Sequence, residues 1–137
     1  MQADLFKKTA ILIEQNPIET VLYSDALSAN CFDVLVTSSP MEALVKLRET
    51  EIDLVLIDMG DASNAFISKF VQNIRKEKKC EFTVIFGLSI YPFNNEKNMK
   101  LNLDACLTKP FSIDTLIDRI FSSIESKCND CECINSK

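Results

Sequence analysis

Three reactive side chains, Asp58, Ser89 and Lys109, each follow directly after a short run of mostly apolar residues. An open α/β sheet with parallel strands places its chemistry at the carboxyl ends of those strands. If the three runs are strands of one such sheet, an acid, a hydroxyl and an amine meet at one edge. Asp58, a carboxylate at the end of a buried strand, is the residue whose role most needs an explanation.

The elements that must position these residues follow from the apolar pattern. Short apolar and β-branched runs predict strands at 10–13, 32–36, 52–57, 82–88 and 105–107. Helical stretches are predicted at 18–30, from 38–40 onward, at about 63–78 and after 110, with the weakest helical pattern at 91–100. Because parallel strands need helical crossovers, this alternation predicts an α/β fold with an open, doubly wound sheet of five parallel strands.

Apolar residues recur at helical spacing in two of the predicted helices. In the first helix these residues are Ile18, Val21, Leu22, Ala26 and Leu27. In the third helix they are Phe66, Ile67, Phe70, Val71 and Ile74, which form its predicted buried stripe.

A chain of 137 residues is long enough for one domain with a proper core and short for two. We expect one domain over residues 1–126 and a flexible, cysteine-containing tail over 127–137. The chain has no apolar run of membrane-spanning length, and its start leads into a strand rather than a signal-peptide pattern. We therefore expect a cytoplasmic protein with no membrane partner.

The charge and the absence of histidine exclude several functions. A formal net charge of −5 disfavours direct binding to nucleic acid, which depends on clustered Lys and Arg. The chain has no histidine, so it lacks the most common general base and cannot carry a phosphohistidine itself. Any phosphohistidine donor must be another protein.

From about residue 8 to residue 125 the chain resembles the receiver domain of two-component response regulators. The resemblance is carried by Asp58 after the third strand, Ser89 after the fourth and Lys109-Pro110-Phe111 after the fifth, with Glu14-Gln15 in place of the usual acidic pair. It implies a flavodoxin-like, chemotaxis-regulator-like fold: a three-layer sandwich with strand order 2-1-3-4-5.

The resemblance also implies a function in phosphorelay signal transduction, and we expect a stand-alone receiver, because the residues after the last predicted helix are too few for a DNA-binding module. Asp58 would accept a phosphoryl group from a histidine kinase or phosphotransfer protein, a reaction that needs positioning and charge neutralisation more than covalent help. Lys109 would supply a fixed positive charge, and Ser89 would donate a hydrogen bond to the phosphorylated form. The downstream target would bind the face formed by helix four, strand five and helix five, and a homodimer is among the assemblies that the resemblance allows.

The resemblance further implies a Mg²⁺ site at Asp58, Glu14, Gln15 and the backbone carbonyl of Gly60. The alignment places Gln15 as the direct ligand and Glu14 as the outer, water-mediated one. Gln15 offers a neutral carbonyl where the family has a carboxylate, so we expect weaker Mg²⁺ binding. Glu14, or Asp61 just past the acceptor, is a candidate to compensate.

Three other positions depart from the family's pattern. Ile90 follows Ser89 where a small residue is usual, Cys106 replaces an aromatic residue three positions before Lys109, and the loop 59–64 lacks a common proline. These departures motivate an alternative function: a pseudo-receiver that binds partners independently of phosphorylation. A structural ion pair between Asp58 and Lys109 fits that alternative.

Two further alternatives concern cofactors. The segment Cys128 to Cys133 carries three thiols, one fewer than a tetrahedral zinc site needs, so we expect reduced thiols and no zinc. A flavin- or nucleotide-binding enzyme on the same architecture would need a glycine-rich phosphate loop, and the chain has only two glycines, Gly60 and Gly87. A phosphoacceptor signalling domain, which is not an enzyme in the ordinary sense, is therefore the leading hypothesis, with the pseudo-receiver second.

Overall fold

The computed structural model describes residues 7–60, 64–92 and 101–135, with side chains described up to residue 127 in the last segment. Five strands lie in the described segments: β1 (Lys8–Ile13), β2 (Phe32–Thr37), β3 (Leu54–Asp58), β4 (Val84–Ser89) and β5 (Ala105–Thr108). The helices in the same segments are α2 (Pro17–Ala29), α3 (Pro40–Glu49), α4 (Asn64–Lys76), the short 3₁₀ helix η1 (Lys78–Cys80) and α6 (Ile113–Asn135).

The five strands form one sheet in the order β2-β1-β3-β4-β5, and every pair is parallel. This confirms the predicted sheet and its strand order. The register pairs Ile13 with Ile57, Asp58 with Leu88, and Ser89 with Thr108. The carboxyl ends of β1, β3, β4 and β5 therefore lie along one edge of the sheet, as the sequence predicted.

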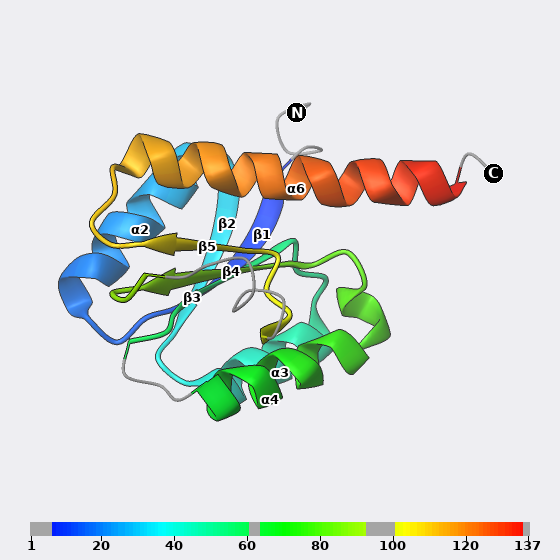
Figure 1. Ribbon diagram of the computed structural model, residues 1–137, viewed down its shortest axis with the longest axis horizontal. Helices are drawn as coiled ribbons and strands as arrows, with labels where there is room; N and C mark the ends of the chain where they lie inside the picture. Colours follow the sequence, from blue (N-terminus) through cyan, green and yellow to red (C-terminus); the bar gives the residue numbers. More distant parts are fainter. Residues whose placement is uncertain (1–6, 61–63, 93–100, 136–137) are drawn as a thin grey trace.

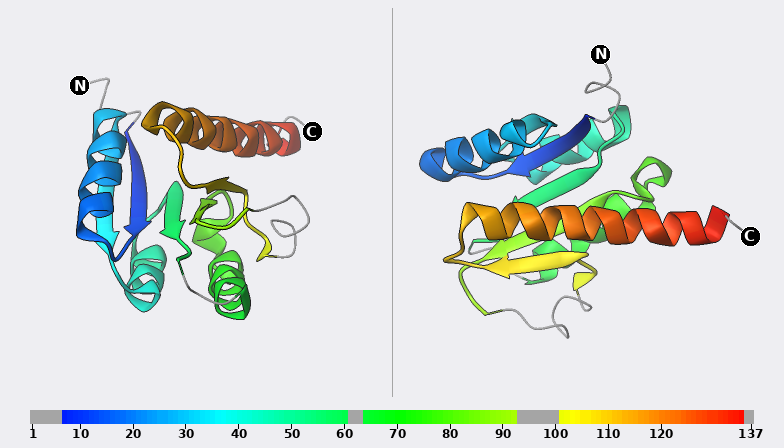
Figure 2. Two further views of the ribbon diagram at one scale, coloured as in Figure 1. Left: turned by 60° about the vertical axis from the view of Figure 1, so that its left-hand side comes forward. Right: turned by 90° about the horizontal axis from the view of Figure 1, so that it is seen from above.

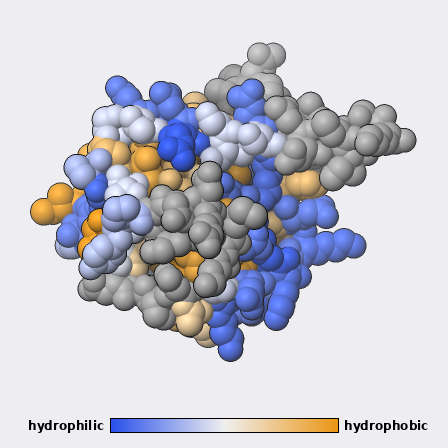
Figure 3. Space-filling model, viewed as in Figure 1, coloured by the Kyte–Doolittle hydropathy of each residue, from blue (hydrophilic) through white to orange (hydrophobic). Residues whose placement is uncertain are grey.

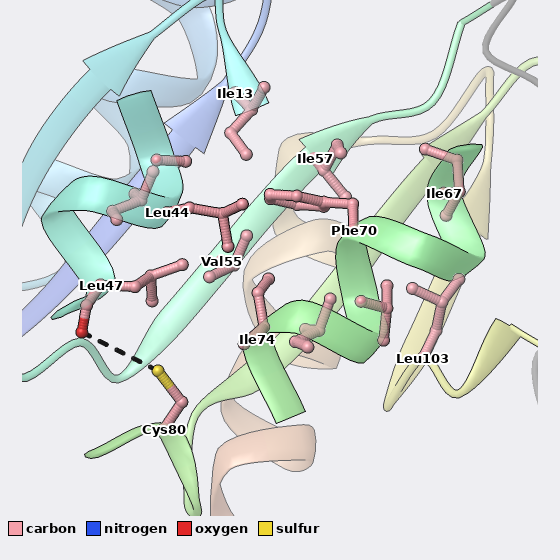
Figure 4. Packing of buried hydrophobic residues seen from close by; sticks show 14 of the residues in the cluster. Ile13, Leu44, Leu47, Val55, Ile57, Ile67, Phe70, Ile74, Cys80 and Leu103 are labelled. Atoms are coloured by element: carbon pink, nitrogen blue, oxygen red, sulfur yellow. Dashed lines mark hydrogen bonds between the residues drawn. The ribbon is translucent and has the colours of Figure 1, made fainter. Parts of the chain in front are cut away.

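Helices cover both faces of the sheet (Figures 1 and 2). Helices α2 and α6 pack on one face, against buried side chains such as Leu12, Leu56 and Phe86. Helices α3 and α4 pack on the other face of the sheet, where Leu44, Leu47, Phe70 and Ile74 lie against strand β3 (Figure 4). Each residue buried in this way contributes on the order of 1.5–3 kcal/mol, so the two layers hold the strand ends in place.

Local sequence signals set where α2 begins. Asn16 is the N-cap, and its side-chain oxygen accepts hydrogen bonds from the backbone N–H groups of Ile18 and Glu19. Pro17 occupies the first helical position, where a missing N–H costs nothing. This start places Glu19 in the first turn, directly after β1 and next to the edge that carries Asp58.

The apolar residues whose spacing predicted α2 are only partly buried. Leu27 is buried and Ala26 packs against the core, whereas Ile18, Val21 and Leu22 are 79%, 60% and 47% exposed. The helix also buries Tyr23. Glu19, Tyr23 and Leu27 lie four residues apart and share one stripe of the helix, so the stripe that faces the sheet includes two polar side chains. Figure 3 shows apolar surface among hydrophilic surface on the side where α2 lies.

Helix α4 follows its predicted pattern with one exception. Ile67, Phe70, Val71 and Ile74 are buried, but Phe66 is 49% exposed and does not join the core. Phe66 lies one position before Ile67 on the helix, at the margin of the buried stripe and beside the open end of the sheet.

Two expectations fall at the limits of the described residues. Four α-helices are described, and most of the fifth expected helix, at 91–100, lies outside the described residues, so five helices are not confirmed. The tail boundary expected at residue 127 falls inside α6, which continues to Asn135 because its backbone hydrogen bonds run on past that point. The side chains of Cys128, Cys131 and Cys133 lie outside the described residues.

No helix in the described part of the chain is both long and apolar enough to cross a membrane.

Candidate functional site

The candidate site lies where β1, β3 and β5 end. Glu14 follows β1, Asp58 is the last residue of β3, and Lys109 comes directly after β5. The three positions come together because the parallel register aligns the strand ends. Ionisable side chains from three distant parts of the sequence thus share one edge.

Lys109 is the charged centre of the site. Its Nζ donates hydrogen bonds to Oδ2 of Asp58 and to Oε1 of Glu19, each at 2.5 Å. The Lys109 side chain is 19% exposed and the Asp58 side chain 11%. Burial by itself would lower the pKa of Lys109, but the two carboxylates outweigh it and raise the pKa above its ordinary value. Lys109 is therefore a fixed positive charge.

Glu14 is a buried carboxyl group that is only partly satisfied. Its residue is 6% exposed, Oε2 accepts a hydrogen bond from the backbone N–H of Asn16 at 3.2 Å, and Oε1 has no hydrogen-bond partner among the described residues. Burial, followed by the nearby carboxyl group of Asp58 and the charge of Glu19, raises the pKa of Glu14 to about 7. An unpaired oxygen in such a place is poised to accept a ligand.

The donor set fits a hard divalent cation. One carboxylate oxygen from each of Glu14, Glu19 and Asp58 can be chosen so that all three lie within 4.8 Å of one another. Carboxylate oxygens are the ligands that Mg²⁺ prefers, and Glu14, whose Oε1 is unpaired among the described residues, belongs to this group.

A cavity of about 470 Å³ opens beside Asp58. Its lining includes Glu14, Gln15, Asp58, Gly60 and Phe66. Gly60 donates its backbone N–H to Oδ1 of Asp58 at 2.9 Å, and its φ of +43° is a conformation that favours glycine. The cavity gives an anionic group a route to the Asp58 carboxylate.

The expected metal ligands lie at this cavity, but they differ in burial. Glu14, expected as the outer ligand, is buried next to Asp58, whereas Gln15, expected as the direct ligand, is exposed at the cavity lining. Asp61, the other candidate, lies outside the described residues. Whether these residues bind a metal stays a prediction.

Ser89 lies at the same edge, and its hydroxyl group is engaged locally. The residue is 4% exposed, its Oγ donates to the backbone carbonyl of Tyr91 at 2.9 Å, and it accepts from the N–H of Tyr91 at 3.0 Å. In this conformation the Ser89 hydroxyl stabilises the turn after β4. A role toward Asp58 requires that these two hydrogen bonds open.

Two of the positions that depart from the expected pattern, Ile90 and Cys106, differ in exposure. Ile90 is 48% exposed. Cys106, in contrast, is buried, and burial raises the pKa of its thiol to about 11. Cys106 is therefore a neutral packing residue in the described structure.

Sequence reasoning missed Glu19 and its partner Tyr23. The Tyr23 hydroxyl donates to Oε1 of Glu19 at 3.0 Å, and the Tyr23 ring stacks on Phe111 with the ring centroids 6.1 Å apart. Burial, followed by the hydrogen bond to the Glu19 carboxylate, raises the pKa of Tyr23, so its hydroxyl remains a donor. The available signal was the four-residue spacing of Glu19 and Tyr23 just after a cap residue.

The comparisons with known proteins lead to response regulators. No family model matches the chain. The polar-differentiation response regulator DivK of Brucella ovis is 23% identical over 117 residues, which cover 84% of this chain and 94% of that protein. The same regulator of Brucella anthropi is 22% identical over equal shares of the two chains.

Solved structures agree with the fold. A response regulator from Thermotoga maritima superposes with a TM-score of 0.71 and 26% identity, covering 88% of this chain and 99% of that one. The chemotaxis response regulator CheY4 of Vibrio cholerae has a TM-score of 0.74 and 18% identity, covering 85% and 98%. The receiver domain of a sensor histidine kinase from Pseudomonas aeruginosa, with a magnesium ion in its active-site cleft, has a TM-score of 0.73 and 16% identity, covering 87% and 98%.

These similarities confirm the resemblance drawn from Asp58, Ser89 and Lys109. Receiver domains are signalling domains rather than classic enzymes. In sequence and in fold, this chain fits a response-regulator receiver domain of two-component signalling.

Proposed function

We propose that this chain is a receiver that accepts a phosphoryl group on Asp58 in a phosphorelay. The observation that carries the proposal is the contact of Lys109 Nζ with Asp58 Oδ2 at 2.5 Å, beside an open cavity. A carboxylate that only capped a turn would need neither a buried lysine partner nor an approach for a ligand. Phosphoryl transfer needs both.

The chemistry is a displacement at phosphorus. An oxygen of the ionised Asp58 carboxylate supplies the electron pair of the new P–O bond, and the bond from phosphorus to the donor breaks with its pair leaving on the donor. No proton has to leave Asp58, so the missing histidine is no obstacle. Lys109 stabilises the negative charge that the phosphoryl oxygens carry in the transition state.

A divalent cation would be held by Asp58 and Glu14, with Gln15 and the Gly60 carbonyl as the remaining ligands that the resemblance implies. When bound, it supplies further positive charge against the phosphoryl oxygens. The unpaired Oε1 of Glu14 supports this assignment. We propose Mg²⁺ as the cation, and the absence of zinc from the cysteine segment stays a prediction.

Ser89 is the proposed reporter of the phosphorylated state. Its hydroxyl would exchange its two bonds with Tyr91 for one bond to the phosphoryl group, and the turn after β4 would move with it. The proposed output is a change on the surface around β5 and α6, which a downstream protein reads.

The proposed partners are a histidine kinase or phosphotransfer protein as donor and a downstream target protein. Homodimer formation and a cytoplasmic location stay predictions. No membrane or nucleic-acid partner is proposed.

The test is the intact mass of the protein after incubation with acetyl phosphate or phosphoramidate, with and without Mg²⁺. We expect a gain of one phosphoryl group that depends on Mg²⁺ and is lost in Asp58→Asn. Asp25→Asn, an exposed acid on α2, is the matched control and should label like the unchanged protein. No gain under any condition would overturn the proposal and favour a phosphorylation-independent interaction module.

A further inference from the structure

Glu19 is an acid that the proposed phosphoryl chemistry does not use, yet it contacts the central lysine. Its Oε1 accepts a hydrogen bond from Lys109 Nζ at 2.5 Å, the same distance that separates Nζ from Asp58 Oδ2. The two residues of this ion pair are 90 positions apart, and their side chains are 28% and 19% exposed. The ammonium group of Lys109 is thus shared between the acceptor carboxylate and a second carboxylate.

The position of Glu19 is well defined by its neighbours. Its backbone N–H donates to the Asn16 cap at 3.0 Å, and its Oε1 accepts from the hydroxyl of Tyr23 at 3.0 Å. Tyr23 is 3% exposed and is stacked on Phe111, two residues after Lys109. Glu19 is therefore held at its backbone by Asn16 and at its carboxylate by Tyr23. Tyr23 in turn stacks on Phe111, in the segment that carries Lys109.

The charges make this contact costly for phosphoryl transfer. Glu19 places a negative group within 4.8 Å of a ligand oxygen of Asp58, where a dianionic phosphoryl group would arrive. The Lys109 ammonium group has three hydrogens, and Asp58 and Glu19 each accept a hydrogen bond from it, so a phosphoryl group that makes more than one contact with Lys109 competes with Glu19. In the unphosphorylated site, the Glu19 carboxylate thus accepts a hydrogen bond from Lys109 that a phosphoryl oxygen would otherwise accept.

We propose that Glu19 is a positioning residue. Its carboxylate holds the ammonium group of Lys109, competes with the incoming phosphoryl group for that ammonium group, and so slows phosphorylation of Asp58. The proposal rests on the proposed function, since it concerns the same acceptor and the same lysine. During transfer Asp58 gains its P–O bond and the donor's bond breaks as described above. Lys109 exchanges its hydrogen bond with Glu19 for one with a phosphoryl oxygen, and no proton or electron is transferred in that exchange.

The test measures the rate of labelling against acetyl phosphate concentration at saturating Mg²⁺. Glu19→Gln keeps the shape of the side chain and removes its charge, so the second-order rate constant of labelling should rise about tenfold. Tyr23→Phe removes the hydrogen bond that holds Glu19 and leaves the charge, so a smaller rise is expected. Asp25→Asn removes an exposed acid from the same helix and should stay within about twofold of the unchanged protein.

A second readout does not depend on turnover. Beryllofluoride mimics the phosphoryl group, and its binding with Mg²⁺ can be followed by fluorine NMR. Glu19→Gln should reach half-saturation at a beryllofluoride concentration several-fold lower than the unchanged protein. Impaired folding would weaken this binding and slow labelling, so a gain in both readouts separates a positioning role from a structural one.

Two failures are distinguishable. If the unchanged protein labels on Asp58 and Glu19→Gln labels at the same rate or more slowly at saturating Mg²⁺, the inference about Glu19 is overturned and the proposed function stands. A slower rate together with weaker Mg²⁺ binding would instead assign Glu19 to the cation. If no variant labels at all, the proposed function itself fails, and the inference fails with it.

Discussion

Lys109 Nζ lies 2.5 Å from Oδ2 of Asp58, although the two residues are 51 positions apart in the chain. The contact exists because β3 and β5 end at the same edge of the sheet on either side of β4. Because both side chains are mostly buried, their interaction is little screened by water.

Replacing Lys109 by Gln should reduce labelling of Asp58 by acetyl phosphate at least about 100-fold, since the fixed positive charge is lost. The free energy of unfolding should fall by on the order of 1–2 kcal/mol, because Asp58 and Glu19 lose their shared partner. Rates are measured by intact mass and stability by urea unfolding. Lys46→Gln, at an exposed lysine on α3, should change neither quantity, and an equal loss in both variants would contradict a specific role for Lys109.

Replacing Glu14 by Gln should change how stability depends on pH. The folded-state pKa of Glu14 is raised from 4.5 to about 7, so between these values the folded protein binds more protons than the unfolded one. Its free energy of unfolding therefore falls as pH rises through this window. Glu14→Gln does not titrate, so its stability relative to the unchanged protein should improve by about 1–3 kcal/mol between pH 4.5 and pH 8.

The measurement for Glu14 is urea unfolding of both proteins at pH 4.5, 6 and 8. Glu51→Gln, at an exposed acid, is the control and should give a difference that does not vary with pH. A Glu14→Gln difference that also stays constant would mean that the pKa of Glu14 is the same in the folded and the unfolded protein.

The sheet was predictable because its central strands β3 and β4 are continuous apolar runs, which a layer buried on both faces accommodates. From the predicted sheet it followed that Asp58, Ser89 and Lys109 lie at the same edge, at the carboxyl ends of the strands. The contact between Lys109 and Glu19 was not predictable in the same way, since it depends on how α2 is rotated about its own axis. The apolar spacing that predicted α2 does not fix this rotation, since Leu27 is buried together with Tyr23 whereas Ile18, Val21 and Leu22 are exposed.

The orientation of the Ser89 hydroxyl was also beyond the sequence. A strand end followed by a polar residue predicts where the hydroxyl lies, but its choice between Asp58 and the backbone of Tyr91 depends on the turn after β4. A rotamer of one side chain decides the choice. The position of the residue and the direction of its hydrogen bond are thus separate predictions.

Replacing Gln15 by Asp should tighten Mg²⁺ binding about tenfold, because a second carboxylate would join Glu14 at the cavity lining. The affinity is measured by calorimetric titration or by Mn²⁺ relaxation. Gln72→Asp, at an exposed residue of α4, adds the same charge elsewhere and should have little effect. An unchanged affinity in Gln15→Asp would mean that Glu14 and Glu19 already provide the carboxylates that bind the ion.

Replacing Gly60 by Ala should destabilise the protein by about 1 kcal/mol through its backbone rather than through a clash. The φ of Gly60 is +43°, whereas the nearest atom to an added Cβ, Oδ1 of Asp58, lies at an ordinary 3.6 Å. Gly60→Asn should cost less, because asparagine tolerates this conformation better than alanine does. Thermal unfolding compares the two variants, and Gly60→Asn should keep the higher Tm.

Since the N–H that Gly60 donates to Asp58 remains in both variants, their labelling rates should stay close to that of the unchanged protein. Equal Tm values would show that the backbone at residue 60 adapts freely, and a large loss of labelling would mean that the Asp58 carboxylate depends on the glycine itself.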